Sequence, residues 1–297
     1  MAEYFDPETY PQEWNYLQSG TIIDQYMIER ELAHGGFSSV YLARQLADQV
    51  QVAIKEYLPR KMAHRTWNNT VIAHNDACKA QFLKGRALFF EEAKVLVNLK
   101  HPNIVEVINF FQANSTVYLV MVYDFGMTLD KIIKERALEM TEAWMLQVFD
   151  KLLQGVAVIH AHHLAHLDIK PANILLRPGN DPLLLDFGAI QSFPSTPKQL
   201  SNRICTQGFS PVEQYASTGN LGPWTDIYAI GATMRACLEY KIPLAAPERA
   251  KQDTLQPLST VFAQKFSPKL LGAIDAAMAV QPEQRPQSVE ELQQMLA

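Results

Sequence analysis

The apolar pattern of this 297-residue chain changes its period near residue 123, and that change restricts the possible folds more than any other feature. Before it, short β-branched or alternating runs predict antiparallel strands at residues 21–32, 38–46, 51–57, 103–112 and 115–123. After it, helical spacing predicts helices at 128–136, 141–161, 225–239, 267–279 and 287–296, interrupted by a β-like stretch at 173–185. We therefore expect an α+β chain in which a small five-stranded antiparallel lobe precedes a larger, mainly helical lobe.

The small lobe is expected to contain one helix. Apolar residues at positions 89, 93, 96 and 99 have helical spacing, and the run stops before Pro102. The predicted limits are a tail at 1–19, the small lobe at 20–123 and the larger lobe at 124–297.

Two segments of the first hundred residues carry opposite charge. Residues 57–86 form a polar stretch, interpreted as an irregular insert, with six basic side chains against Asp76 alone and a net charge of +5. Residues 1–19 contain four acidic side chains and no basic one. Docking of the tail on the insert is one hypothesis, and a solvated insert is the other.

Composition narrows the class of protein. A net charge of −5 argues against nucleic-acid binding through bulk positive charge. The longest apolar run, residues 117–123, is far shorter than the roughly 20 residues of a membrane-spanning helix, and residues 1–14 show no secretory signal. Cys78, Cys205 and Cys237 lack metal-ligand spacing and are interpreted as free thiols. We expect a cytoplasmic protein with no membrane span and no nucleic-acid partner.

Two features of the small lobe indicate an anionic ligand. Residues 32–40 place two adjacent glycines between predicted strands, where missing Cβ atoms let backbone N–H groups approach phosphates. An ordinary Gly-Gly turn is the alternative. Lys55 lies in an apolar strand, and a buried ammonium needs an anionic partner, for which Glu91 and Glu92 are candidates. An edge-strand lysine with a solvated amine is the alternative.

Residues 166–173, His-Leu-Asp-Ile-Lys-Pro-Ala-Asn, carry the strongest chemical signal. Their spacing suits Asp168 to accept a hydroxyl proton, Lys170 to stabilise transferred negative charge and Asn173 to bind a hard cation through its amide oxygen. Thirteen residues after Asn173, an apolar strand ends at Asp186-Phe187-Gly188. Asp186 is therefore placed to hold Mg²⁺ against phosphates.

Taken in order, these segments resemble the eukaryotic-like protein kinases of the bacterial serine/threonine branch, from about residue 21 to 297. The matching set is the glycine-rich loop (32–40), V-A-I-K (52–55), the helix glutamate Glu92, H-x-D-x-K-x-x-N (166–173) and D-F-G (186–188). The register of the His-Pro-Asn-Ile-Val segment selects Glu92 over Glu91.

Later positions agree with the resemblance. Pro211-Val212-Glu213 stands where the family usually has Ala-Pro-Glu, and Asp226 and Gly231 resemble the buried aspartate and glycine of the central helix. Arg285 stands where the family places the arginine that pairs with Glu213.

The resemblance implies a bilobal protein-kinase-like fold, a kinase domain only, and transfer of the ATP γ-phosphate to Ser or Thr hydroxyls of protein substrates, with autophosphorylation. It implies ATP with Mg²⁺ or Mn²⁺, metal binding by Asn173 and Asp186, and catalysis by Asp168, Lys170, Lys55 and Glu92. The nucleotide-binding positions it implies are Leu32, Ala33, His34, Gly35, Gly36, Phe37, Ser38, Val40, Ala53, Lys55, Met121, Val122, Tyr123, Asp124, Asn173 and Asp186.

Three positions depart from the family pattern. Ala33 and Ser38 stand where the glycine-rich loop usually has glycines. Leu167 replaces the arginine that binds a phosphorylated activation-loop residue in the family, and an apolar side chain cannot do so. We therefore expect activity that does not require this phosphate, although hydroxyls at Ser192, Ser195, Thr196, Ser201, Thr206 and Ser210 leave autophosphorylation open.

Alternatives remain at this point. A nucleotide-binding pseudokinase scaffold is disfavoured by the complete set of charged positions, and a small-molecule phosphotransferase by Glu213, Asp226 and Arg285. A zinc site at His160, His162, His163 and His166 lacks cysteine or carboxylate partners at suitable spacing. Protein substrates and a regulatory protein are the expected partners, without identity.

Overall fold

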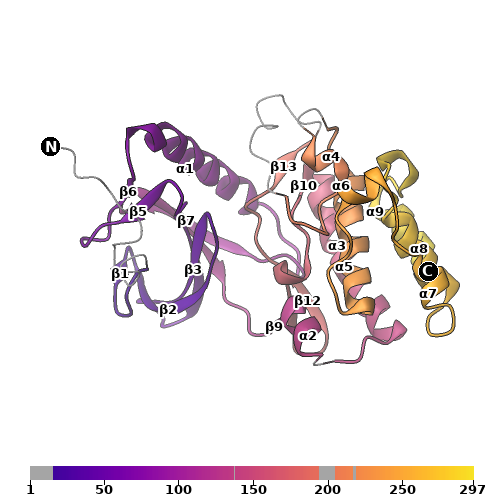
Figure 1. Ribbon diagram of the computed structural model, residues 1–297. Helices are drawn as coiled ribbons and strands as arrows, with labels where there is room; N and C mark the ends of the chain where they lie inside the picture. The colour runs from indigo at the N-terminus through magenta and orange to yellow at the C-terminus, as the bar shows by residue number, and fades with distance from the viewer. Residues whose placement is uncertain (1–15, 137, 194–204, 217–218) are drawn as a thin grey trace. The chain divides into compact units, whose positions relative to one another are not determined.

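The computed structural model describes residues 16–136, 138–193, 205–216 and 219–297. The chain divides into two compact units, the first comprising Met1–Lys100 and Glu106–Asp124 and the second His101–Val105 and Phe125–Ala297 (Figure 1). The first unit is a β-sheet with a long helix and the second is mainly helical, so the predicted α+β class is confirmed.

The first unit is built on a six-stranded antiparallel sheet of order β1-β2-β3-β4-β8-β7. Its strands are β1 (Ile22–Ile23), β2 (Tyr26–His34), β3 (Ser38–Gln45), β4 (Gln51–Tyr57), β7 (Val107–Ala113) and β8 (Thr116–Val122). The sequence predicted five strands. The sixth arises because Asp24, at φ 52°, turns the chain and splits the expected strand at 21–32 into β1 and β2.

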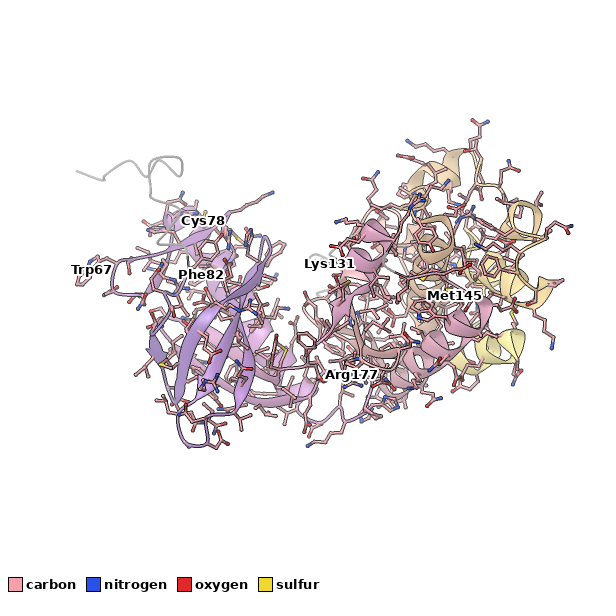
Figure 2. All side chains as sticks on the ribbon, turned by 90° about the horizontal axis from the view of Figure 1, so that it is seen from below. Trp67, Cys78, Phe82, Lys131, Met145 and Arg177 are labelled. Atoms are coloured by element: carbon pink, nitrogen blue, oxygen red, sulfur yellow. The ribbon has the colours of Figure 1, made fainter. Side chains whose placement is uncertain are left out.

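The stretch at 57–86 is more regular than expected. It contains the hairpin of β5 (Ala63–Arg65) and β6 (Val71–Ala73), and helix α1 (Asp76–Leu96) begins thirteen residues before Phe89. The side chain of Asn75 caps the helix by accepting a hydrogen bond from the N–H of Cys78 at 3.0 Å. Trp67, at the tip of the hairpin, projects outward and is 81% exposed (Figure 2).

The start of α1 was missed for a physical reason. Only Phe82 is buried in its first half, whereas Phe89, Ala93 and Leu96 are buried in the second. One apolar anchor among lysines and arginines is too weak a periodic signal to predict a helix.

A buried ion pair joins the sheet to the hairpin. Glu56 of β4 is fully buried; it accepts hydrogen bonds from the hydroxyls of Tyr41 (3.0 Å) and Tyr118 (2.7 Å) and pairs with Arg65. Burial first, and then the Glu56 charge, raise the pKa of both tyrosines, so each keeps the proton it donates. Arg65 also donates to the carbonyl of Asn69 at 3.0 Å, so one buried guanidinium fixes both the sheet and the hairpin turn.

The helices of the second unit are α2 (Leu129–Glu135), α3 (Glu142–Ala161), α4 (Val212–Tyr215), α5 (Pro223–Glu239), α6 (Ala246–Lys251), α7 (Leu258–Val261), α8 (Pro268–Ala277) and α9 (Val289–Leu296). Helix α5 is buried from Thr225 to Leu238 and is the centre of the unit, with α8 packed against it (Figure 1). Within the described residues, no helix has the length and apolar character needed to cross a membrane.

Short strands of the second unit hold the loop that contains the candidate residues 166–173. Strands β9 (Met127–Thr128), β11 (Ile174–Arg177) and β12 (Asp181–Leu184) form one small sheet, and β10 (Leu164–Ala165) pairs with β13 (Gln191–Ser192). Both pairs bracket residues 166–173, so this loop is held at its two ends.

The Glu56–Arg65 pair yields a stability prediction. Arg65→Met keeps most of the side-chain volume but leaves a buried carboxylate uncompensated, so we expect a loss of about 3–5 kcal/mol in the free energy of unfolding, measured in urea. The matched control is Lys134→Met, which breaks an exposed pair with Asp130 and should cost at most about 1 kcal/mol. Equal losses in the two variants would contradict the structural role of Arg65.

Candidate active site

The loop at 166–173 is anchored by one carboxylate. Asp226, fully buried in the first turn of α5, accepts the N–H of His166 and the N–H of Leu167, each at 2.8 Å, and pairs with His160 Nε2 at 2.8 Å. Burial raises the pKa of Asp226, but the hydrogen bond and charge of His160 and the backbone donors outweigh it, so its pKa lies below the ordinary value. The carboxylate is therefore charged, and it fixes the start of the loop through two backbone N–H groups.

Leu167 adopts a backbone conformation that leucine rarely takes, at φ 64°. Its N–H is held by Asp226, and its carbonyl accepts Gln214 Nε2 at 2.6 Å. Its buried side chain packs in an apolar cluster with Ala165, Ala189 and Leu221. The surrounding contacts therefore impose a strained turn immediately before Asp168.

Asp168, Lys170 and Asn173 come together as the sequence predicted. Lys170 Nζ lies 2.8 and 2.7 Å from the two carboxylate oxygens of Asp168, and Asn173 Nδ2 donates to Asp168 Oδ2 at 2.9 Å and to its carbonyl at 2.8 Å. The hydroxyl of Thr206 donates to Asp168 Oδ1 at 2.7 Å and accepts from Lys170 Nζ at 3.2 Å. The site thus already holds a hydroxyl between a carboxylate and an ammonium.

Asp186 lies next to this loop through strand pairing. Strands β11 and β12 are in register from Ile174 opposite Leu184, and the N–H of Leu185 donates to the carbonyl of Asn173 at 2.8 Å. Asp186 follows at φ 53°, and its Oδ1 accepts the N–H of Gly188 at 3.0 Å. Asn173 and Asp186 therefore stand at adjoining ends of two paired strands.

His166 connects the loop at 166–173 to the segment at 185–187. Its Nε2 contacts the carbonyl of Leu185 at 3.1 Å, its Nδ1 accepts the N–H of Asp168 at 3.3 Å, and its ring lies 4.8 Å from that of Phe187. Burial lowers the pKa of His166 despite the opposing pull of Asp226 and Asp168, so the imidazole is neutral near pH 7.

The donor set at Asn173 and Asp186 fits Mg²⁺. The amide nitrogen of Asn173 is committed to Asp168, which turns its carbonyl oxygen, a hard ligand, away from that carboxylate. In the described part of the chain no group of three or more His, Cys, Asp or Glu could hold a metal by itself. Mg²⁺ is typically bound by one or two protein oxygens together with phosphates and water, and this pair supplies that number.

The four histidines proposed as alternative zinc ligands have other contacts. His160 pairs with Asp226, His162 Nδ1 contacts the carbonyl of Val158 at 2.9 Å, His163 packs edge-on against Phe193, and His166 braces the loop. Within the described residues they do not form a group of three or more ligands that could hold a metal.

In the first unit, Lys55 lies on a central strand. It is opposite Val40 of β3 and Leu119 of β8 and only 6% exposed, so the edge-strand alternative is wrong. Its Nζ lies 5.8 Å from the centre of the Phe89 ring on α1. Glu92 is three residues further along the helix and so shares that face.

The two candidate glutamates differ in their surroundings. Glu91 is exposed and pairs with Lys94 at 2.7 Å. Glu92 lies near Tyr57, which is on the same strand as Lys55. Burial raises the pKa of Tyr57, and the Glu92 charge adds to this effect, so that the pKa is about 12. This geometry favours Glu92 as the partner of Lys55.

The glycine-rich residues form the turn between β2 and β3. The N–H of Gly35 donates to the carbonyl of Ser38 at 2.8 Å, and Phe37 is 55% exposed. Neither Gly35 nor Gly36 has positive φ, and a Cβ at Gly36 would meet nothing within 4 Å. The turn itself therefore does not need two glycines, which leaves the close approach of a ligand as a reason for them.

The remaining predicted nucleotide positions lie on neighbouring strands. Ala53 is opposite Met121, both are buried, and Val40 is opposite Ala33. The N–H of Val122 donates to the carbonyl of Glu106 at 2.9 Å, so this N–H is already bonded within the first unit. The set is completed by Leu32, His34 and Ser38 in the hairpin and by Tyr123 and Asp124 after β8.

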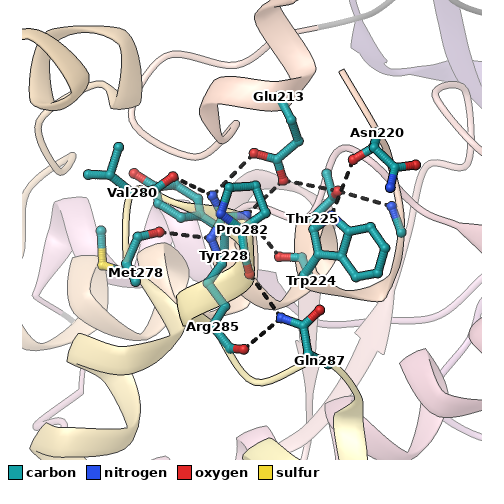
Figure 3. A network of polar contacts seen from close by, with 12 residues as sticks. Glu213, Asn220, Trp224, Thr225, Tyr228, Met278, Val280, Pro282, Arg285 and Gln287 are labelled. Carbon is teal, nitrogen blue, oxygen red and sulfur yellow. Dashed lines mark hydrogen bonds and ion pairs between the residues drawn. The ribbon is translucent and has the colours of Figure 1, made fainter. Parts of the chain in front are cut away.

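The expected pair of Glu213 and Arg285 is present (Figure 3). Arg285 Nη1 and Nη2 donate to the two Glu213 carboxylate oxygens at 2.7 and 3.1 Å, and both side chains are buried. Arg285 also donates to the carbonyls of Val280 (2.8 Å) and Trp224 (3.1 Å). Arg285 thus joins helix α4, which contains Glu213, to the first turn of α5.

Sequence reasoning missed two supports of the site. Gln214 holds the carbonyl of Leu167, and His160, considered only as a zinc ligand, pairs with Asp226. The one available signal was the position of His160 at the end of a long helix that leads into the loop. Residues 1–15, Ser195, Thr196 and Ser201 lie outside the described residues.

Comparison with known proteins gives the family. Residues 26–296 match the model of the protein kinase domain, so the chain belongs to the protein kinase family. It is 29% identical over 286 residues to serine/threonine-protein kinase D of Synechocystis sp., covering 93% of this chain and 52% of that protein. It is 27% identical over 279 residues to serine/threonine-protein kinase PrkC of Bacillus subtilis, covering 92% and 40% respectively.

A solved structure agrees over nearly the whole chain. The apo form of PpkA-294 matches with a TM-score of 0.85 and 31% identity, covering 95% of this chain and all of that one. The chain spans about half the length of kinase D and less of PrkC. The resemblance to bacterial serine/threonine kinases is confirmed.

The Asp226 anchor yields a prediction about stability and pH. Asp226→Asn removes the charge that two backbone donors and His160 require, so we expect a loss of about 3–5 kcal/mol in the free energy of unfolding. Because the folded-state pKa of Asp226 is lowered, its contribution is fully present above about pH 4 and is lost as the pH falls through the lowered value. Urea titrations from pH 7 to pH 3 measure both effects.

The control for this variant is Asp150→Asn on the exposed face of α3, where the carboxylate accepts hydrogen bonds from Gln154 and Gln293. It should change the free energy of unfolding by less than about 1 kcal/mol. A loss no larger in Asp226→Asn than in Asp150→Asn would show that the loop does not depend on this carboxylate.

Proposed function

We propose that the chain is a serine/threonine protein kinase that transfers the γ-phosphate of ATP to Ser or Thr hydroxyls of protein substrates and to itself. The observation that carries the proposal is the Thr206 hydroxyl held between Asp168 and Lys170, beside Asn173 and Asp186. This arrangement is what a hydroxyl acceptor and a metal-bound phosphate require.

The first unit would bind the nucleotide. Lys55 contacts the α- and β-phosphates and Glu92 fixes its position, while the backbone of residues 32–40 covers the phosphates. Support comes from the buried, central position of Lys55 and from the open space above Gly36. Met121 lies beside Ala53 where the adenine would pack, and Val122–Asp124 offer backbone groups to its edge.

The second unit would carry out the transfer. Asn173 and Asp186 would hold Mg²⁺, which would supply positive charge to neutralise the phosphates. Asp168 orients the substrate hydroxyl and takes its proton as the oxygen bonds to the γ-phosphorus, and the bond to the β–γ bridging oxygen breaks to release ADP. Lys170 stabilises the charge of the phosphoryl group in transit.

We further propose that activity does not depend on a phosphorylated activation loop. Leu167 packs in an apolar cluster and the loop is held by Asp226 and Gln214, so the turn before Asp168 is fixed by uncharged packing and buried hydrogen bonds. Position 167 has no arginine that could bind such a phosphate.

Mn²⁺ can replace Mg²⁺ on the same oxygen ligands. The cytoplasmic location stays a prediction.

Replacing Asp168 tests its assignment as the proton acceptor. In Asp168→Asn, transfer from labelled ATP with Mg²⁺ should fall by about 10²–10⁴-fold, because the proton acceptor is lost, whereas affinity for ATP should be retained. The matched control is Asp130→Asn, an exposed carboxylate on α2 that should leave the rate unchanged. A wild type that binds ATP but transfers nothing would instead indicate the pseudokinase alternative.

Removing all phosphate from the protein tests the role assigned to Leu167. A sample shown by mass spectrometry to be fully dephosphorylated should start turnover at about the rate of the untreated protein. A strong lag, or complete loss of turnover that returns only with phosphorylation of residues 187–212, would contradict independence from the phosphate.

A further inference from the structure

The turn between β2 and β3 is held from behind by the segment that follows β4. The N–H of Arg60 donates to the carbonyl of Gly36 at 3.1 Å, and the N–H of Leu58 donates to that of Phe37 at 2.9 Å. The Arg60 side chain adds a third contact, from Nη2 to the hydroxyl of Ser39 at 3.2 Å. Three bonds therefore fix the tip of a glycine-rich turn that would otherwise be free to move.

Arg60 is itself in contact with three other segments. On β2, Glu31 Oε1 lies 3.8 Å from Arg60 Nη2. The carbonyl of Arg60 contacts His74 Nε2 at 2.9 Å, which ties Arg60 to the β5–β6 hairpin. On the other side, Arg60 Nη1 donates to the hydroxyl of Tyr16 at 3.0 Å, and the guanidinium lies 4.7 Å from the centre of the Tyr16 ring. The guanidinium is thus held by both a hydrogen bond and a cation–π contact.

Tyr16 belongs to the end of the N-terminal tail, and the sheet anchors it there. The next residue, Leu17, is 3% exposed in the apolar core of the sheet, and its N–H donates to the Tyr41 hydroxyl at 3.3 Å. The Tyr16 ring also lies 5.6 Å from the ring of His34, at the end of β2. The described end of the tail therefore contacts both Arg60 and the strand that leads into the glycine-rich turn.

We propose that Arg60 is a positioning residue for the phosphate-covering loop and that Tyr16 sets its position, so that the N-terminal segment controls the affinity for ATP. The proposal rests on the proposed function, in which residues 32–40 cover the phosphates. A loop held in place before ATP arrives loses less entropy on binding. Any partner that displaces Tyr16 from Arg60 weakens ATP binding without touching the transfer chemistry of the second unit.

The test compares Arg60→Ala, Arg60→Lys, Tyr16→Ala and the neighbouring exposed Lys61→Ala as control. Arg60→Ala should raise KM for ATP and the calorimetric Kd for Mg·ATP roughly fivefold to twentyfold and leave kcat within about twofold. The guanidinium contacts that it removes, to Ser39 and Tyr16, hold the loop, and none involves the transfer residues of the second unit. Tyr16→Ala should act in the same direction more weakly. Arg60→Lys should recover only part of the ATP affinity, since a compact ammonium cannot bind the Ser39 and Tyr16 hydroxyls at once as the planar guanidinium does.

Coupling between the two residues is measured in the double variant. Since Tyr16 acts through Arg60, the double variant should have the KM of Arg60→Ala rather than the product of the two effects. Multiplicative effects would show that Tyr16 does not act through Arg60 and would overturn that half of the proposal.

A second readout needs neither ATP nor activity. Hydrogen exchange of the amides at residues 35–39 in the nucleotide-free protein should accelerate in Arg60→Ala and Tyr16→Ala and stay unchanged in Lys61→Ala. If the wild type turns over but the Arg60→Ala and Tyr16→Ala variants show unchanged exchange or unchanged ATP affinity, the positioning role of Arg60 and Tyr16 is overturned and the proposed function stands. A wild type without transfer activity overturns the proposed function. The exchange rates and the Kd for Mg·ATP then still test the positioning role of Arg60 and Tyr16.

Discussion

The catalytic loop of this chain depends on one buried charge. Asp226 sits in the first turn of α5, the most buried helix of the second unit, and its carboxylate fixes two successive backbone N–H groups before Asp168. A buried carboxylate is costly unless fully bonded, and here His160 completes the set. The strained turn at Leu167 and the position of Asp168 follow from this interaction.

The first unit uses the same device in a different place. Buried Glu56 binds Tyr41, Tyr118 and Arg65, so one polar cluster joins the sheet to the β5–β6 hairpin. Arg60, between that hairpin and the glycine-rich turn, extends the connection to the loop proposed to cover phosphates. In each unit, therefore, a buried carboxylate holds the segments around the candidate site residues.

The sequence predicted the elements that have several apolar or polar residues at regular spacing. It missed elements that depend on one buried or one left-handed residue. The strands around Lys55 and the loop from Asp168 to Asn173 were predicted because apolar period and polar spacing lie in short, continuous segments. The first half of α1 was missed because Phe82 is its one buried anchor, and β1 because a single left-handed residue, Asp24, makes the turn. Contacts such as Gln214 to Leu167 join residues 47 apart in sequence and carry no local signal.

The central claim is that the site phosphorylates serine or threonine through Asp168. The most direct measurement incubates the wild type with ¹⁸O-labelled γ-phosphate ATP and Mg²⁺, adds the Asp168→Asn protein as an acceptor, and maps the phosphorylated residues by mass spectrometry. The account predicts labelled phosphoserine or phosphothreonine on the variant only when the wild type is present. Label confined to tyrosine or to small molecules, or equal label in the absence of the wild type, would contradict it.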